Sequence, residues 1–344
     1  MDNYQLEIDF QSASDEEIKD WLISKKVLFV TNSIMLPGST FVSSVRTYFE
    51  YIPIHNFYVV PGVSNNKPFY GLNAFLDLTA KFLTERVFMQ YDYVIYIDED
   101  AFITDFKSMI DDFADFISED KYCLAGPQDG GVFCHRNHIS LFFNSFISFW
   151  NMKMLRRATT AQEFIKVVND IASHKPNEFS YFIKKLQTEN PTLLRTMKED
   201  AQRSIWKVKD YRMAQFDENG ETPYAQVVKN DLNNPVEPHQ VPYSNTNDTE
   251  TGNFEPYYLI EEAFVLVTKK PILYLYATDY YNKDEDNEEM DNTGLTSAVF
   301  HPFTNKMYCV HTWFSRAYSK YPINKLMLEH TNRINKVILK YGKV

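Results

Sequence analysis

The sequence has only three cysteines, Cys123, Cys134 and Cys309, and no long apolar run. Three cysteines cannot form a disulfide framework, and their spacing does not match a zinc site, so we expect reduced thiols. The longest aromatic-rich run, residues 139–150, is too short and too polar to span a bilayer. The first ten residues lack the basic flank and apolar stretch of a signal peptide. These absences predict a cytoplasmic protein without a transmembrane segment.

The chain also lacks an excess of positive charge. It carries 35 basic and 46 acidic residues, which gives a formal net charge of −11. Proteins that bind duplex nucleic acid normally show a basic stripe, and none is visible here, so we expect no nucleic-acid partner. The same charge balance argues against docking on anionic lipid.

Several catalytic and metal-binding motifs are missing. The sequence has no G-x-x-x-x-G-K-[ST] loop, so ATP-type hydrolysis is not expected, and it has no G-x-S-x-G elbow or H-E-x-x-H pair. The acidic stretch 279–292 lacks the central glycine that an EF-hand loop needs, and it is interpreted as a solvated loop. No internal repeat is present.

The 344 residues, 44% of them hydrophobic, are enough for one large α/β domain. Strand and helix patterns alternate along the first third, which predicts a doubly wound, mostly parallel sheet flanked by helices. We expect strands at 26–33, 56–62, 92–100 and 122–127, and helices at 15–25 (capped by Ser14), 39–51, 69–90 and 105–118. Such sheets bind ligands at the carboxyl ends of their strands. Three loops, at 31–39, 97–102 and 126–131, should converge there.

The second half is less regular. Residues 151–253 are expected to form an inserted lobe, helical to about residue 215 and then a long loop rich in Asn, Pro, Asp and Thr. Order returns in a helix at 255–270, followed by strands at 272–277 and 307–313. A basic helical tail at 319–344 completes what we interpret as a single domain.

The strongest chemical signal is YDYVIYIDEDAF, where a buried strand runs into Asp98 and Asp100. Side chains alternate along an extended chain, so these two carboxylates share one face and Glu99 takes the other. Two adjacent negative charges are costly near a buried sheet unless a cation neutralises them. Mg²⁺ and Mn²⁺ prefer oxygen ligands and also bind substrate phosphates. An acidic pair after a strand also occurs in phosphatases, kinases and polymerases, and an Asp-rich turn is the structural alternative.

In this order of features the chain resembles nucleotide-sugar glycosyltransferases of the GT-A fold. The resemblance rests on KVLFVTNS, the D-x-D pair in YIDED, the GPQDGG loop, FFNSFISFWN and VHTWFSRAY. It is similar in this respect to bacterial and phage glycosyltransferases of surface-polysaccharide type. The resemblance covers roughly residues 26–150 and 254–318, and the stretch between them matches nothing that we can name.

The resemblance implies roles for individual residues. It puts His311 beside the metal, where neutral imidazole is an acceptable ligand for Mn²⁺. Arg316 would pair with the donor diphosphate, a task that suits a guanidinium group. Glu99 would also lie against the donor. The first strand-loop, with Thr31, Asn32 and Ser33, would meet the nucleoside. The alternatives are a core histidine, a surface arginine and a polar turn.

Three carboxylates are candidates for the catalytic base: Asp129, Glu261 and Glu262. In an inverting enzyme such a group removes the proton of the acceptor hydroxyl. Glu261 and Glu262 lie on a predicted helix about 100° apart, so only one is expected to face the cleft, and Glu262 is preferred. Asp129 could bind the acceptor instead. A surface or capping role is an equal alternative for each, and the stereochemistry stays open.

The sequence thus predicts a metal-dependent glycosyltransferase of hexosyltransferase type. The expected partners are a UDP- or GDP-sugar donor and a saccharide or other glycan acceptor, with Mn²⁺ or Mg²⁺ as cofactor. One alternative is a nucleotidyltransferase of similar fold, which would normally show a Gly-rich basic loop after its first strand. Another is a carbohydrate-binding protein that keeps the fold without catalysis.

Overall fold

The computed structural model describes residues 8–33, 57–61, 63–64, 67–68, 72–98, 101–127, 141, 143, 146–173, 181–204, 257–279, 297–304 and 306–311. The described helices are α1 (Asp15–Ser24), α3 (Leu72–Thr84), α4 (Arg86–Met89), α5 (Phe106–Ile117), α6 (Met152–Ala158), α7 (Ala161–Ser173), α8 (Tyr181–Glu189), α9 (Pro191–Ser204) and α11 (Tyr257–Thr268). The described strands are β1 (Val27–Ser33), β2 (Phe57–Pro61), β3 (Val63–Ser64), β4 (Lys67–Pro68), β5 (Tyr93–Ile97), β6 (Ala101–Ile103), β7 (Leu124–Pro127), β8 (Ile147–Asn151), β9 (Ile272–Leu275), β10 (Ala277–Asp279), β11 (Ser297–Phe300) and β12 (Met307–His311).

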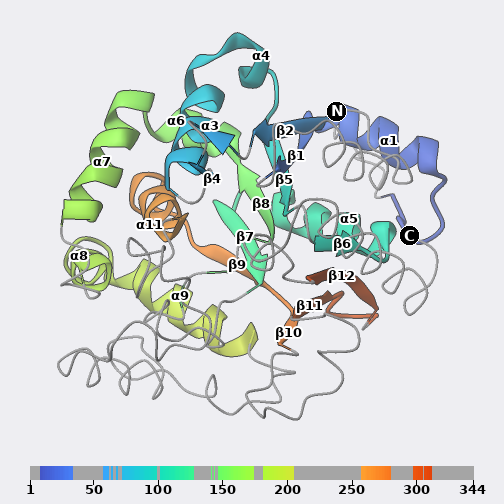
Figure 1. Cartoon of the computed structure of the whole chain (residues 1–344). Helices are drawn as coiled ribbons and strands as arrows, with labels where there is room; N and C mark the ends of the chain where they lie inside the picture. Colours follow the sequence, from blue (N-terminus) through green and yellow to red (C-terminus); the bar gives the residue numbers. More distant parts are fainter. Residues whose placement is uncertain are drawn as a thin grey trace, which may run out of the picture.

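A six-stranded sheet forms the centre of the molecule, in the order β2-β1-β5-β8-β7-β9 (Figure 1). The pairs β2–β1, β1–β5 and β7–β9 are parallel, whereas β8 pairs antiparallel with both β5 and β7. Among the described strands of this sheet, β8 is therefore the single one that runs against the others. The prediction of an α/β fold with a mostly parallel, helix-flanked sheet is confirmed at this level.

Strand β8 was not predicted. Its five residues, ISFWN, are all buried, so they show no alternation between apolar and polar positions. A short, continuous apolar run cannot be distinguished from a buried helix by periodicity alone. The strand continues into α6, which begins at Asn151, whose side-chain oxygen accepts the backbone N–H of Met154.

A second sheet has the order β10-β11-β12-β6 and is antiparallel throughout. We predicted only β12 among its strands. The other three have three or four residues each, too few for a period-two pattern to be recognised. This sheet joins the segment after β5 to the strand that ends at His311.

Two buried clusters cover the two faces of the central sheet. Along β1, Phe29 belongs to a cluster with α1, α5 and the second sheet, whereas Val30 belongs to a cluster with α3, α6, α7, α8, α9 and α11. This is the alternation that a sheet buried on both faces requires. Helices α7 to α9 lie in the region predicted as an inserted lobe, yet they contribute Phe164, Phe182 and Leu194 to the main core.

The predicted helix at 15–25 is confirmed as α1, with a capping box at its start. Ser14 Oγ accepts the backbone N–H of Glu17 at 3.3 Å, and the Glu17 carboxylate accepts the N–H of Ser14 at 2.8 Å. The predicted helix at 69–90 is wrong as a single helix. It is divided into α3 and α4 at Glu85, whose backbone is extended (φ −89°, ψ 124°). The break lets Phe88 turn inward and pack against Tyr58 and Phe82.

Three helices end on a residue with left-handed backbone. Lys26 (φ 55°), Asp120 (φ 48°) and Lys269 (φ 56°) follow α1, α5 and α11, and precede β1, β7 and β9. A left-handed residue after the last helical turn is a common helix ending, and it turns the chain sharply into the next element. The predicted helix at 39–51, the loop at 216–253, the tail at 319–344 and nearly all of the acidic stretch 279–292 lie outside the described residues.

Candidate active site

The carboxyl ends of the parallel strands meet at one edge of the central sheet, which we call the carboxyl edge. Strand β1 ends at Ser33 and β5 at Ile97, and Thr31 is in register with Ile97. Strands β7 and β9 end together, with Pro127 opposite Leu275. The sequence analysis expected its ligand-binding loops at this edge.

Asp98 is the first residue after β5 and is half-buried. Its carboxylate accepts a hydrogen bond of 2.6 Å from the hydroxyl of Tyr96, a side chain that is itself only 1% exposed. The backbone N–H of Asp98 donates to the carbonyl of Phe146 at 2.8 Å, and its carbonyl accepts the N–H of Ala101 at 3.0 Å. The Asp98 carboxylate is therefore held by a buried phenol directly after β5.

His311 reaches the same turn from the far end of the chain. Strand β12 pairs antiparallel with β6, and the register sets His311 opposite Ala101 and Cys309 opposite Ile103. The pKa of the buried Cys309 thiol is raised well above its usual range, first by burial and then by the charge of Asp98. Glu99 and Asp100, the side chain of His311 and all of Arg316 lie outside what the structure describes.

The strand predicted at 26–33 is confirmed as β1. Thr31, Asn32 and Ser33, which were also predicted to open a loop, are the last three residues of this strand and pair with Val59, Val60 and Pro61 of β2. Thr31 is fully buried. Asn32 and Ser33 follow it at the carboxyl end of β1, and their contact with a nucleoside stays a prediction.

Both candidate glutamates on α11 are buried, Glu261 at 4% and Glu262 at 0% exposure. The Glu261 carboxylate accepts the backbone N–H of Phe143 at 3.2 Å. The neighbouring Tyr274 hydroxyl donates to the carbonyl of Leu141 at 2.7 Å. Helix α11 and strand β9 thus hold the segment that leads from β7 back into β8. Asp129 lies outside the described residues.

The end of β7 is closely packed against that segment. A Cβ built on Gly126 would overlap the ring of Phe143, so this position requires a residue without a side chain. Cys123 and Tyr274 belong to the buried apolar cluster, and this burial raises the pKa of Cys123 to about 12 and that of Tyr274 well above its usual range. Glu261 contributes to both shifts as a nearby negative charge. None of these packing residues was singled out from sequence, although Gly126 opens the predicted GPQDGG loop.

Among the predicted metal ligands only Asp98 has a described side chain, and carboxylate oxygens are ligands that Mg²⁺ and Mn²⁺ prefer. Carboxylates that bind metals are themselves usually hydrogen-bonded, as Asp98 is by Tyr96. Within the described residues, no group of three or more His, Cys, Asp and Glu side chains is arranged to hold a metal. The predicted set of Asp98, Asp100 and His311 is only partly among those residues, so it stays a prediction.

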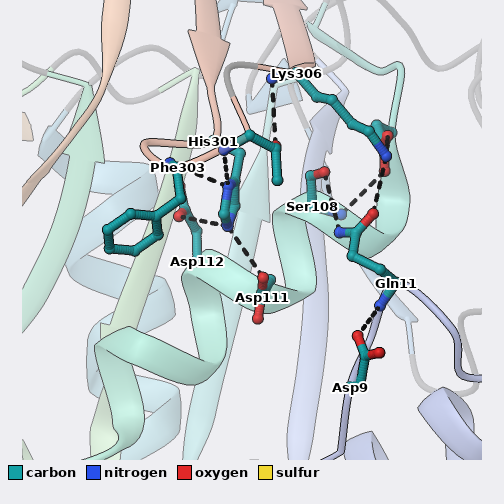
Figure 2. Close-up of polar contacts among 10 residues, drawn as sticks. Asp9, Gln11, Ser108, Asp111, Asp112, His301, Phe303 and Lys306 are labelled. Atoms are coloured by element: carbon teal, nitrogen blue, oxygen red, sulfur yellow. Dashed lines mark hydrogen bonds and ion pairs between the residues drawn. The ribbon is translucent and has the colours of Figure 1, made fainter.

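A second polar cluster surrounds His301, far from Asp98 in the sequence (Figure 2). His301 Nδ1 accepts the backbone N–H groups of Phe303 and Thr304, so the proton is on Nε2, which lies 3.1 Å from the Asp111 carboxylate. Lys306 contacts Gln11 at 2.9 Å and Asp105 at 3.7 Å. Both imidazole nitrogens are thus occupied in fastening the β11–β12 turn to α5, which gives this histidine a structural role.

In the described portion of the chain, no helix is long and apolar enough to cross a membrane. This agrees with the absence of a long apolar run from the sequence.

No protein-family profile and no curated protein matches the chain. Two solved structures overlap with it in part. One is a glycosyltransferase involved in glycosylation of the major capsid of PBCV-1, with 16% identity and a TM-score of 0.30 over 47% of this chain and 75% of that one. The other is the glycosyltransferase GlyE of Streptococcus pneumoniae TIGR4, with 12% identity and a TM-score of 0.24 over 72% of this chain and 66% of that one. Overlaps this small do not bear on the fold or the function of the chain.

Proposed function

We propose that the protein is a metal-dependent glycosyltransferase of the GT-A type, which moves a sugar from a UDP- or GDP-sugar to a saccharide acceptor. The observation that carries the proposal is the pairing of His311 with Ala101 beside Asp98. This backbone pairing sets the strand that carries His311 beside the segment that follows Asp98, at the carboxyl edge of a mostly parallel sheet. That edge is where α/β sheets bind nucleotides.

In this proposal Asp98, Asp100 and His311 hold Mn²⁺ or Mg²⁺. A bound cation would neutralise the diphosphate as it leaves. Tyr96 fixes the orientation of the Asp98 carboxylate through its hydroxyl, which is already in place in the buried core. Preorganisation of this kind avoids reorganisation costs during the reaction.

The donor would lie along the ends of β1 and β5. Asn32 and Ser33 would contact the nucleoside, while Glu99 and Arg316 would contact the sugar and the diphosphate. Thr31, being fully buried, would support the strand end from within and not through direct contact.

Glu262 is proposed as the base that takes the proton of the acceptor hydroxyl. Its side chain is 0% exposed, so this role requires the acceptor hydroxyl to enter the buried interior beside α11. Glu261, which accepts the Phe143 N–H, is assigned the different task of fixing the segment before β8. A carboxylate in an apolar environment is a stronger base than one in water, because burial disfavours its charged form. Asp129 is the alternative base or an acceptor ligand, and residues 151–253 would select the acceptor.

The test is an assay of products from a panel of UDP- and GDP-sugars, with Mn²⁺ and then with EDTA. Release of nucleoside diphosphate that requires metal supports sugar transfer of hexosyltransferase type. A nucleotidyltransferase would instead release pyrophosphate from nucleoside triphosphates. A carbohydrate-binding protein would show a shift in melting temperature with ligand and release neither product.

A further inference from the structure

The opposite edge of the central sheet, which we call the amino edge, is formed by the segments that enter the parallel strands and by the helix that leaves β8. These segments are 23–26, 85–92, 118–123, 152–158 and 269–271. Backbone hydrogen bonds link neighbouring segments in their spatial order along the edge. Asp92 N–H donates to Lys26, Lys153 N–H to Asp92, Asn151 N–H to Cys123 and Cys123 N–H to Pro271. The amino edge is thus one connected row of backbone segments, which reaches α4 and α6 in the upper part of Figure 1.

Positive charge is concentrated on this edge, although the whole chain carries −11. Its five segments are fully described and contain nine basic and four acidic side chains, a formal excess of five positive charges. The basic residues are Lys25, Lys26, Arg86, Lys121, Lys153, Arg156, Arg157, Lys269 and Lys270. The acidic residues are Glu85, Asp92, Glu119 and Asp120. The net charge of −11 argued against docking on anionic lipid. The net charge of the whole chain does not show that basic residues are concentrated on this one edge.

The two central carboxylates of the edge are already shared between cations. Asp92 is 2.8 Å from Arg156 and 3.6 Å from Lys26. Asp120 is 3.5 Å from both Lys153 and Arg157. Each carboxylate therefore holds two basic side chains in position but neutralises only one charge. Of these basic side chains, Lys26 and Arg157 are 59% and 65% exposed, whereas Arg156 is only 17% exposed, so Lys26 and Arg157 carry the exposed positive charge beside these carboxylates.

Exposed apolar side chains accompany the charge. Val87 and Met89 on α4 are 67% and 46% exposed, and Ile23, at the end of α1, is 46% exposed. Phe88 between the first two is buried and packs against Tyr58 and Phe82. Helix α4 is thus anchored by one aromatic ring and presents its two flanking apolar side chains outward. Only Phe303 among the other described large apolar side chains is comparably exposed.

We propose that the amino edge docks on an anionic membrane surface, with Val87 and Met89 inserting among the lipid headgroups. A nucleic acid or another polyanion would satisfy the basic residues, but it would leave the two apolar side chains in water. A membrane interface satisfies both features, since basic residues attract anionic lipid and apolar side chains enter the headgroup boundary. This inference does not depend on the proposed function.

Docking in this way fixes the orientation of the protein. The carboxyl edge, with Asp98, lies at the opposite ends of the same strands, about 15–20 Å away for strands of five residues. The candidate active site therefore faces away from the bilayer. If the proposed function holds, it would act on a glycan that extends from the surface or on a soluble acceptor, and not on a sugar next to a lipid headgroup.

The experiment is vesicle flotation with the full chain, comparing phosphatidylcholine vesicles with mixed phosphatidylserine–phosphatidylcholine vesicles. We expect binding only to the anionic vesicles, weakened by salt because exposed charges are screened. Lys121→Glu with Lys270→Glu reverses two exposed charges on the edge and should lower the partition coefficient at least about tenfold. Val87→Ser with Met89→Ser should also weaken vesicle binding, while leaving heparin binding unchanged.

Lys184→Glu with Arg195→Glu is the matched control, because these exposed residues lie on α8 and α9 at the lower left of Figure 1. This variant has the same net charge as the edge variant and should bind vesicles like the wild type. Melting curves verify that each variant is folded. Equal loss in both charge variants would mean that only net charge matters and would overturn the proposal. A second result would also overturn the proposal: Val87→Ser with Met89→Ser binds vesicles like the wild type, and the protein binds heparin or duplex DNA as tightly as vesicles. The edge would then be a surface for polyanions.

Discussion

The backbone of His311 pairs directly with that of Ala101, although the two residues are separated by most of the chain. Ala101 closes the turn that begins at Asp98, and its N–H donates to the Asp98 carbonyl at 3.0 Å. Strand β12 thereby lies beside the segment that follows β5, which is the juxtaposition that the proposed metal site requires.

The first prediction concerns metal affinity at this junction. If His311 is a ligand, His311→Ala should weaken Mn²⁺ binding by about 10–100-fold, the range usual for lost metal-site support. Electron paramagnetic resonance of free Mn²⁺ measures the affinity without any assay of activity. The exposed carboxylate variant Glu16→Gln serves as control and should bind like the wild type. Unchanged affinity in His311→Ala would remove the histidine from the site.

The two glutamates of α11 should respond differently to substitution. Glu262→Gln should lower kcat by about 10²–10⁴ while donor affinity barely changes, because a base acts on the acceptor. Glu261→Ala should instead destabilise the fold by about 1–3 kcal/mol, since the Phe143 N–H loses its buried acceptor. Glu261→Gln retains an acceptor oxygen and should recover most of that stability. Steady-state kinetics and chemical denaturation measure the two effects separately. If Glu262→Gln transfers sugar at the normal rate, Glu262 is not the base. The base would then be Asp129, or the enzyme would use a retaining mechanism.

Gly126 offers a test of the packing at the end of β7. Gly126→Ala should destabilise the protein by about 1–3 kcal/mol, because the added methyl group overlaps the Phe143 ring. The control is the same change in a Phe143→Ala background, where it should cost little. A double-mutant cycle from denaturation curves gives the coupling between the two residues. Equal costs in both backgrounds would mean that the ring does not limit this position.

The stability of the protein should depend on pH through Asp112. Burial raises the pKa of this carboxyl well above its ordinary value of 3.8, and the Tyr308 hydroxyl only partly offsets the shift. The folded state therefore holds the proton more tightly than the unfolded state, so stability falls as pH rises through 3.8 toward the folded-state pKa. Asp112→Asn removes the buried charge. It should gain stability over the wild type as pH rises across this window and show no gain below it. Urea denaturation at several pH values measures the difference, and a constant difference at all pH values would contradict the account.

The sequence was informative where a pattern is long or a motif is local. Helix α1 was predicted from its Ser14 N-cap, and β1 and β5 from their apolar runs before polar residues. Strand β8 and the short strands of the second sheet were missed, because a fully buried or three-residue strand has no usable period. The Tyr96–Asp98 contact could have been found, since residues two apart in a strand share a face. The pairing of His311 with Ala101 could not, because register between distant strands is set by tertiary packing.

The most direct test of the central claim is metal-dependent donor turnover by the wild type and by Asp98→Asn. Purified protein is incubated with Mn²⁺ and UDP- or GDP-sugars, and the nucleoside diphosphate that is released is quantified. The account predicts turnover that vanishes with EDTA, returns with Mn²⁺ and falls by at least about 10²-fold in Asp98→Asn, while the melting temperature is retained. Turnover by Asp98→Asn near the wild-type rate at low Mn²⁺, or wild-type turnover that is unaffected by EDTA, would contradict it.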